Sequence, residues 1–431
     1  MKYFGTDGIR GVAHKELTVE LAAKVGYALS VAYVGKSFVI GMDTRESSYA
    51  LASALGNSIK YSATEVKSAG VVSTLMLSYY AKTKNMIGIM ITASHNPYYD
   101  NGIKVFNEGK KLSQEEELKI EKIIDETKNI TVINKKLEKV NIENTYLKMI
   151  KKIPFAGMFS ECVFDCANGA TSFIAPRVFV SGEAISNSPD GKNINEKCGS
   201  TYIENISSKI KGTNKFGFAF DGDGDRMIMV YKGMVLDGDI QIYLMAKYLS
   251  DINALSGSAV AITKMSNPGL IKALNKIGVS AVLTDVGDKH IISEMISSNL
   301  SLGGEASGHV ITPYLHTGDG IISALLMMHI YDYYKEEKIN NLIKDLVFYP
   351  MRTVNVYGVS KLLLKEPKVA EYIESVKNTL GDDSLLLVRP SGTEPVIRLT
   401  VSSKSEDVVN NTLENLQQYL LKEGKIWKLM H

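Results

Sequence analysis

A serine and a histidine follow directly on an apolar run near residue 90. The stretch Ile89 to Lys104 reads IMITASHNPYYDNGIK and contains Ser94 and His95. The run Met86 to Ile91 is apolar without alternation, which predicts a buried strand that delivers Ser94 into a loop, where α/β proteins place reactive groups. A hydroxyl is a weak nucleophile unless a neighbour activates it or a strong electrophile receives it. Ser94 is therefore a candidate for covalent chemistry, although the motif alone is equally typical of a turn.

Three carboxylates at alternate positions follow another apolar strand. Phe216 to Phe220 (FGFAF) runs into Asp221, Asp223 and Asp225, with glycines between them. Residues two apart on an extended chain point the same way, so the three side chains can converge on one point. Like charges this close are stable around a cation, and oxygen ligands suit Mg²⁺ when substrate phosphates complete its shell. The motif predicts a metal site in preference to a solvated acidic turn.

Two further loops and the N-terminus offer groups for a phosphorylated substrate. The first loop, GGEASGH at 303–309, presents Glu305, Ser307 and His309, although a loop histidine alone is more often merely exposed. The segment YFGTDGIRG at 3–11 is a glycine-rich loop from which Arg10 projects.

The second loop, RPSGTEP at 389–395, lies between two predicted strands, LLLV at 385–388 and VIRLTV at 396–401. It has the donors of a phosphate cradle, although an ordinary surface hairpin has the same turn residues. The donors are Arg389, Ser391, Thr393, Arg398 and the amides around Gly392.

The elements that position these loops recur in a βα order. Strands are predicted at 38–42, 162–166 and 259–262; a helical pattern precedes the first, and one follows each of the other two. The predicted fold class is α/β: three similar domains with mixed sheets at 1–150, 151–250 and 251–357, and a smaller α+β domain at 358–431, around a central cleft. They would carry the serine, acidic, GGEASGH and RPSGTEP loops, respectively.

The composition is that of an ordinary globular protein. The chain has 431 residues, 45% of them hydrophobic and 22% charged, with a net charge of +2. Nothing indicates a nucleic-acid or membrane partner, because the charge is balanced and no apolar run reaches the ~18 residues of a membrane helix. The start lacks the apolar region of a signal peptide, so a cytoplasmic location is expected. Cys162, Cys166 and Cys198 are expected to be reduced packing residues.

Seven motifs in order resemble the α-D-phosphohexomutase superfamily over the whole chain. They are FGTDGIRG, ASHNPYYDNGIK, DCANGA, PDGKNINEKCGST, DGDGDR, GGEASGH and RPSGTEPVIR. Within the superfamily the chain most resembles the members that act on glucosamine phosphates. The resemblance implies interconversion of glucosamine 6-phosphate and glucosamine 1-phosphate through a phosphoserine enzyme, with glucosamine 1,6-bisphosphate or a similar bisphosphate as activator. It places the reaction on the route to UDP-N-acetylglucosamine and the bacterial cell wall.

The resemblance also implies a role for each matching residue. It makes Ser94 the phosphoserine and, with Asp221, Asp223 and Asp225, the site of one Mg²⁺ per chain. The remaining implied roles are proton and phosphoryl transfer for Arg10, Lys104 and His309, contacts with the sugar hydroxyls for Glu305 and Ser307, and a grip on the second phosphate for the 389–398 region including Arg389, Ser391, Gly392, Thr393 and Arg398.

Several positions depart from the superfamily pattern, and they bear on substrate detail. They are Asp285, Lys289 and His290 around a VGD sequence, Tyr231 where an acidic residue is common, and Tyr202 where histidine is. An acidic group such as Asp285 would favour a protonated amine on the sugar. The alternatives are a phosphomannomutase or phosphoglucomutase, a metal-dependent phosphatase, or a non-catalytic sugar-phosphate sensor. The expected partner is a small sugar phosphate, and a homodimer is compatible with this reading.

Overall fold

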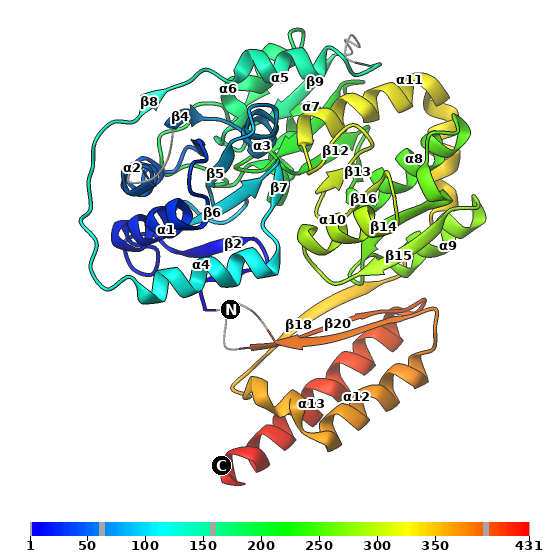
Figure 1. The fold of residues 1–431 in the computed structure, drawn as a ribbon. Coiled ribbons are helices and arrows are strands. Elements are labelled where there is room, and N and C mark those ends of the chain that lie inside the picture. Colours follow the sequence, from blue (N-terminus) through cyan, green and yellow to red (C-terminus); the bar gives the residue numbers. More distant parts are fainter. Residues whose placement is uncertain (1, 60–64, 156–160, 391–395, 431) are drawn as a thin grey trace.

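Four β-sheets follow one another along the chain in the computed structural model, which describes residues 2–59, 65–155, 161–390 and 396–430 (Figure 1). The first three are mixed sheets flanked by helices, and the fourth is antiparallel. The predicted class, three mixed α/β units and a small C-terminal unit, is confirmed. Among the helices of these ranges, none combines the length and apolarity that a bilayer crossing requires.

The first sheet delivers the Ser94 loop. Its order is β1-β2-β6-β5-β3-β4-β8, with β7 paired to β6, and β5-β3-β4-β8 are parallel. The strands are β1 (Phe4–Gly5), β2 (Gly8–Val12), β3 (Phe38–Met42), β4 (Val66–Val71), β5 (Ile87–Ile91), β6 (Asp100–Asn107), β7 (Lys110–Lys111) and β8 (Glu138–Lys139). The helices are α1 (Val19–Ala32), α2 (Ser48–Ile59), α3 (Thr74–Thr83), α4 (Gln114–Glu126) and α5 (Glu143–Ile150).

Helices cover both faces of this sheet, which explains its continuous apolar strands. Phe38 and Ile40 belong to one core with residues of α1, α2 and α4, whereas Val39 belongs to another with residues of α3 and α5. All five residues of the predicted strand β5 are buried. The sequence SQEE at 113–116 predicts a capping box, and the structure contains it: the Ser113 side chain accepts from the Glu116 amide, and the Glu116 side chain accepts from the Ser113 amide.

The second sheet delivers the acidic loop. Its order is β10-β9-β11-β12-β13, with β11 parallel to β9 and antiparallel to β12. The strands are β9 (Cys162–Asp165), β10 (Glu183–Ile185), β11 (Phe216–Phe220), β12 (Met227–Tyr231) and β13 (Met234–Leu236), with helices α6 (Thr171–Val178) and α7 (Glu204–Ile210) and a 3₁₀ turn η1 (Gly199–Thr201). The cysteines are free and buried, as expected.

The third sheet has the order β15-β14-β16-β17 and carries the GGEASGH loop between β16 and β17. The elements are α8 (Gly238–Asp251), η2 (Ser256–Ser258), β14 (Ala259–Thr263), α9 (Pro268–Lys276), β15 (Ser280–Thr284), α10 (Asp288–Ser297), β16 (Gly303–Gly304), β17 (Val310–Ile311) and α11 (Gly320–Asp345). Helix α11 is kinked at Lys335, whose backbone is not helical. Met327 and Met328 on this helix are buried core residues.

The C-terminal unit has its own core and forms a lobe below the rest in Figure 1. Its sheet has the order β18-β20-β19. The elements are β18 (Met351–Tyr357), η3 (Lys361–Lys365), α12 (Pro367–Leu380), β19 (Leu385–Pro390), β20 (Val396–Ser402) and α13 (Glu406–Met430). Strand β18 precedes the boundary expected at 357/358, yet it pairs with β20 along its whole length.

Candidate active site

Ser94 lies in a tight turn just after β5, and its neighbours hold it there. It is buried and has a φ of 53°, a conformation that costs energy for a residue other than glycine. Its amide donates to Thr92 Oγ1 at 2.9 Å, and the Thr92 hydroxyl donates to Asp43 Oδ2 at 2.7 Å. Arg45 Nε also donates to Asp43 Oδ2, at 2.9 Å, in a fully buried ion pair. The loop is thus held rigidly on the first sheet.

The tertiary fold brings Ser94 onto the acidic loop. Ser94 Oγ donates to Asp221 Oδ2 at 2.5 Å across 127 residues of sequence. Asp221, Asp223 and Asp225 each place a carboxylate oxygen within 4.8 Å of the others, and all three are buried. The predicted convergence of the three carboxylates is confirmed.

The residues at this cluster fit a metal ion. The Oδ1 atoms of Asp223 and Asp225 are buried and have no hydrogen-bond partner among the described residues. Burial, together with Asp225 and Asp223, raises the pKa of Asp221 well above its usual range. A bound cation would satisfy the unpaired oxygens and favour the ionised form of Asp221. Oxygen donors suit a hard divalent ion, so the three carboxylates are a candidate metal site next to Ser94.

Lys104 lies behind this cluster and is enclosed by carboxylates. Its Nζ is 2.9 Å from Asp223 Oδ2, 3.2 Å from Asp225 Oδ2 and 3.2 Å from Asp7 Oδ2, and the side chain is 1% exposed. Burial would lower the pKa of Lys104, but Asp223, Asp225 and Asp7 raise it well above its usual range. Lys104 therefore supplies a fixed positive charge next to the acidic loop.

A cavity of about 600 Å³ opens beside Ser94 and the acidic loop. Segments of the first, second and third sheet units line it, including Arg10, His95, Asp225, Arg226, Asp288, Glu305 and His309. Arg10 pairs with Asp7, which also pairs with Lys111. The volume and this mixture of cations and carboxylates fit a small, highly polar ligand.

The N-terminal loop reaches this cavity because one carboxylate anchors the chain before it. The amides of Lys2, Tyr3 and Phe4 all donate to Glu121 of α4, at 2.7 to 3.0 Å. Gly8 has a φ of 79°, and a Cβ there would lie 2.4 Å from the Ile103 carbonyl oxygen. Only glycine fits this approach, which places Asp7 and Arg10 at the cavity.

His309 is buried, although a histidine in a loop motif of this kind is more often exposed. Its Nδ1 lies 3.5 Å from Asp225 Oδ1 and its Nε2 lies 3.7 Å from Asp288 Oδ2. Burial lowers the pKa of His309, but Asp225, Asp288 and Glu305 outweigh it and raise the pKa to about 9. The alternative of a merely exposed loop histidine does not hold, because the GGEASGH loop packs against the acidic loop. The Met227 amide donates to the Gly308 carbonyl at 3.1 Å.

Glu305 lines the cavity, whereas Ser307 is half-buried in the same loop and is not among the lining residues. Glu305 Oε1 accepts from the Gly287 amide at 3.1 Å, which ties the GGEASGH loop to the start of α10. The buried Ser307 Oγ has no partner among the described residues.

The arginines of the C-terminal unit lie on one hairpin. Arg389 on β19 is the direct register partner of Arg398 on β20. Burial and the nearby Arg398 lower the pKa of Arg389. Two guanidinium groups side by side repel each other unless an anion lies between them. Ser391, Gly392 and Thr393 lie outside the described residues.

The positions that depart from the superfamily pattern lie away from the cavity walls. Asp285 is exposed and pairs with Lys264 at 2.7 Å, so in this geometry it is not placed to bind a substrate amine. Lys289 pairs with Glu117 of α4 at 2.5 Å, and His290 is exposed. Tyr231 packs in an aromatic cluster with Phe216 and Tyr331, and Tyr202 is exposed.

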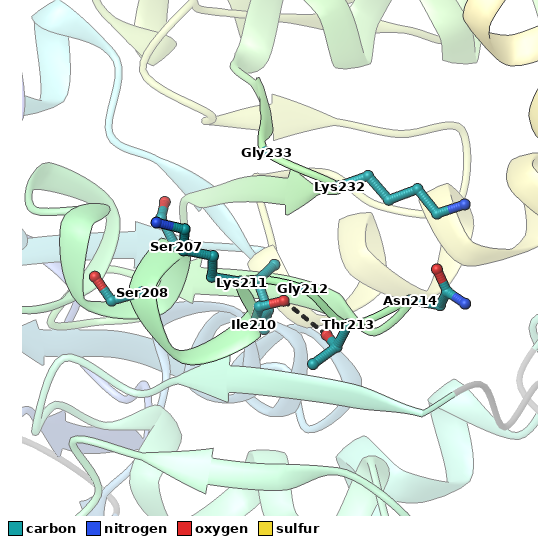
Figure 2. Close-up of a pocket in the computed structure, with 9 residues that line it drawn as sticks. All are labelled: Ser207, Ser208, Ile210, Lys211, Gly212, Thr213, Asn214, Lys232 and Gly233. Atoms are coloured by element: carbon teal, nitrogen blue, oxygen red, sulfur yellow. Dashed lines mark hydrogen bonds between the residues drawn. The ribbon is translucent and has the colours of Figure 1, made fainter.

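A second hollow, of about 610 Å³, lies at the far end of the second sheet. Figure 2 shows that Lys232 and Asn214 extend away from the serines of α7. The Lys232 ammonium pairs with Glu336 at 2.7 Å. Because its polar groups do not converge, this hollow is a weaker candidate than the cavity beside Ser94.

Sequence reasoning gave no role to several residues that the structure places in the site. Asp7, His95, Arg226 and Asp288 lie inside quoted motifs, so their neighbours on the chain were a signal. Thr74 donates to Asp223 Oδ2 at 2.6 Å, and no local pattern pointed to it.

Comparisons with known proteins show similarity along most of the chain. Residues 1–131, 237–348 and 354–417 match the α/β/α domain I, the α/β/α domain III and the C-terminal domain of phosphoglucomutase/phosphomannomutase. The chain is 39% identical to phosphoglucosamine mutase of Bacillus cytotoxicus, covering 96% of this chain and 97% of the relative. It is also 39% identical to that of Bacillus cereus, covering 94% and 95%.

Solved structures share the fold. A phosphoglucomutase/phosphomannomutase family protein of Burkholderia thailandensis has a TM-score of 0.79 at 21% identity, covering 98% of this chain and 97% of that one. Aspergillus fumigatus N-acetylphosphoglucosamine mutase, in complex with GlcNAc-6P and magnesium, has a TM-score of 0.70 at 16% identity, covering 98% and 96%. The chain belongs to the phosphoglucosamine mutase family of the α-D-phosphohexomutases, which are intramolecular phosphotransferases.

Proposed function

We propose that this protein interconverts glucosamine 6-phosphate and glucosamine 1-phosphate, through a phosphorylated Ser94 and a bisphosphorylated sugar. The observation that carries the proposal is the contact between Ser94 Oγ and the buried Asp221–Asp223–Asp225 cluster, beside a cavity lined with charged residues of both signs. The family supports the amino sugar as substrate. The product would feed UDP-N-acetylglucosamine and cell-wall synthesis in the cytoplasm.

Mg²⁺ is the ion we propose for the acidic cluster, held by Asp221, Asp223, Asp225 and the phosphate on Ser94. When bound it would neutralise charge on the phosphoryl group during transfer. Lys104 adds fixed positive charge behind Asp223 and Asp225. Lys104, together with a bound cation, would therefore compensate the negative charge that builds up as the phosphoryl group leaves Ser94.

The first transfer breaks the bond from phosphorus to Ser94 Oγ and forms one from phosphorus to a sugar hydroxyl oxygen. The hydroxyl proton ends on Ser94 Oγ, which leaves as the serine hydroxyl, and among the residues that the family implies, Arg10 and His309 are the groups we assign to assist this proton and phosphoryl transfer. Arg10 and His309 line the cavity, whereas Lys104 lies behind its wall, so we assign Lys104 to charge compensation. The bisphosphate then reorients, and its other phosphate returns to Ser94. A sugar bisphosphate would reload enzyme that has lost its phosphate.

The rest of the substrate would be held by two other units. We assign Glu305 and Ser307 to the sugar hydroxyls, since Glu305 lines the cavity. Arg389, Arg398 and the intervening loop would hold whichever phosphate is not reacting, because facing guanidinium groups favour an anion.

We propose four domains with these roles. The secondary-structure elements favour earlier boundaries than the sequence predicted between the second and third domains and between the third and fourth. Helix α8 is tied to the third unit, because the Asn267 amide donates to Asp239 at 2.8 Å, and the domain III match begins at 237. Strand β18 pairs within the C-terminal sheet. These observations favour junctions near 236 and 350 over 250 and 357. A homodimer remains a prediction, which a measurement of the molar mass by light scattering would test.

The test is a coupled assay with Mg²⁺ and glucosamine 1,6-bisphosphate on glucosamine, glucose and mannose 6-phosphates. We expect the highest kcat/KM for glucosamine 6-phosphate, with sugar 1-phosphate as the product. Release of free phosphate instead would indicate a phosphatase. Equal or better efficiency on another sugar would indicate a phosphoglucomutase or phosphomannomutase.

Ser94→Ala is the matching variant. It should lose activity by at least ~1000-fold, because no other group can carry the phosphoryl intermediate. Peptide mass spectrometry of active wild-type protein should find phosphate on Ser94. Full activity of Ser94→Ala would contradict the assignment. If the wild-type protein binds sugar phosphates but does not turn them over, it is a sensor and not an enzyme.

A further inference from the structure

The segment PDGKNINEKCGST at 189–201 lies beside the reactive serine and has no role so far in the proposed reaction. It follows β10 in the second unit and ends with the 3₁₀ turn η1. Asn195 within it crosses to the first unit, where its side-chain amide reaches the loop that carries Ser94.

Two side-chain NH₂ groups donate hydrogen bonds to the same two backbone carbonyls. Asn195 Nδ2 donates to the Ser94 carbonyl at 2.9 Å and to the Asn96 carbonyl at 3.0 Å. Arg45 Nη2 donates to the same two carbonyls, both at 2.9 Å. Each nitrogen has two hydrogens, so each can serve both oxygens. The turn around Ser94 is thereby held from two units of the protein at once.

The backbone of the second unit presents Asn195 for this contact. Asn195 has a φ of 58°, and its amide donates to the Ala167 carbonyl at 2.9 Å. Gly222, inside the acidic loop, leaves room for the approach, because a Cβ there would lie 2.5 Å from the Ser94 carbonyl oxygen and 3.1 Å from Asn195 Nδ2. The acidic loop, Asn195 and the serine loop thus pack as one unit.

This geometry bears on phosphoryl transfer. A phosphorylated Ser94 carries about two negative charges next to three carboxylates, and repulsion between them would push the loops apart. Ser94 also has an unfavourable positive φ, which persists only where its surroundings enforce it. We infer that Asn195 is a positioning residue that fixes Ser94 Oγ against the acidic loop, so that its loss would slow phosphoryl transfer without weakening sugar-phosphate binding. This inference rests on the proposed mutase reaction.

Asn195→Asp tests it, because aspartate keeps the shape and replaces both donor hydrogens with an oxygen that faces two carbonyl oxygens. We expect kcat, and the single-turnover rate at which glucosamine 1,6-bisphosphate phosphorylates Ser94, to fall about 10- to 100-fold. KM for glucosamine 6-phosphate and its affinity by calorimetry should change less than about twofold, since Asn195 does not line the cavity. Asn195→Gln retains the donors and should recover part of the rate.

Asn193→Asp is the matched control. It makes the same change in the same segment, but Asn193 Nδ2 donates to Ser188 at 3.1 Å, away from Ser94. Equal kcat values for Asn195→Asp and Asn193→Asp, or an effect confined to KM, would overturn the inference. If Asn195→Asp fails to fold by circular dichroism, Asn195→Ala takes its place under the same criteria. Absence of mutase activity in the wild type would instead reject the proposed function.

Discussion

The charged residues around the acidic loop fall into two groups by their position. Lys104 faces three carboxylates and lies behind the cavity wall, whereas Arg10 and His309 face the cavity. A buried lysine with such partners remains charged. Lys104 therefore balances the charge of the acidic cluster, whereas Arg10 and His309 are placed where a ligand in the cavity could reach them.

Asp223→Asn tests the metal cluster. Removing one of three carboxylate charges should lower kcat by about 100-fold or more and raise the Mg²⁺ concentration needed for half-maximal activity. Mg²⁺ titration of activity, with calorimetry on the unphosphorylated protein, measures both effects. Asp332→Asn, at an exposed surface pair, is the control and should behave as wild type. Normal Mg²⁺ dependence in Asp223→Asn would show that the acidic loop does not bind the metal.

Arg398→Ala tests the hairpin arginines. Losing a charge-assisted contact costs about 1.5 to 3 kcal/mol, so KM for the sugar phosphate should rise about 10- to 100-fold. Phosphorylation of Ser94 by the mass-spectrometric assay should persist. Arg352→Ala, on β18 of the same sheet and paired with Asn410, is the matched control. Equal KM values for the two variants would move the distal phosphate site elsewhere.

At the scale of elements, the start of helix α8 joins the third unit to the acidic loop's sheet. Asp237 caps the helix by accepting from the Ile240 amide at 3.0 Å, and the Gly238 amide donates to the Ala306 carbonyl at 3.0 Å. Gly238 is needed because a Cβ there would lie 1.9 Å from the Glu305 carbonyl oxygen. This packing sets the position of the GGEASGH loop.

Asp239, in the first turn of α8, makes stability depend on pH. Burial, with a contribution from Asp237, raises the pKa of Asp239 to about 7. Between about pH 4 and 7 the folded protein keeps a proton that the unfolded chain releases, so this group's contribution to stability falls as pH rises, by up to about 1.4 kcal/mol per pH unit.

Asp239→Asn cannot titrate and should remove that slope. The measurement is the difference in the free energy of unfolding between wild type and variant from pH 4.5 to 8, and the variant should gain on the wild type as pH rises. Asp382→Asn, at an exposed turn, is the control and should leave the slope unchanged. Parallel curves for wild type and Asp239→Asn would contradict the prediction.

At the scale of the whole molecule, ion pairs join the first and third units beside the cavity. Lys111 lies 2.6 Å from Asp288 and also pairs with Asp7, and Lys289 lies 2.5 Å from Glu117. Lys289 and Asp288 both belong to the first turn of α10, next to Gly287 at the cavity. Lys289, one of the positions that depart from the superfamily pattern, thus helps to pack the third unit against the first.

Lys289→Met should destabilise the protein by about 1 to 3 kcal/mol, because it leaves Glu117 largely buried without its partner. Burial already raises the pKa of Glu117, and Lys289 opposes that rise. In a double-mutant cycle with Glu117→Gln, the double variant should be less destabilised than the sum of the singles. The exposed pair Lys335 and Asp332, treated the same way, should couple by less than about 1 kcal/mol. Equal coupling in the two pairs would contradict the prediction.

The sequence by itself predicted the local structure that carries the site. Apolar runs located β5 and β11, the Ser113 and Glu116 pattern located the start of α4, and alternate spacing predicted that the three aspartates converge. These features depend on periodicity and on neighbours along the chain, which a sequence displays directly. The ordered motifs also indicated the superfamily.

Only the tertiary structure decided which distant groups meet. The contact of Ser94 with Asp221, the grip of Asn195 on the Ser94 loop and the pairing of Lys289 with Glu117 each join separate units. The burial of His309 depends on the GGEASGH loop packing against the acidic loop. Such contacts depend on how whole sheets and helices pack, and the local pattern around one residue carries no information about a partner that lies 100 or more residues away.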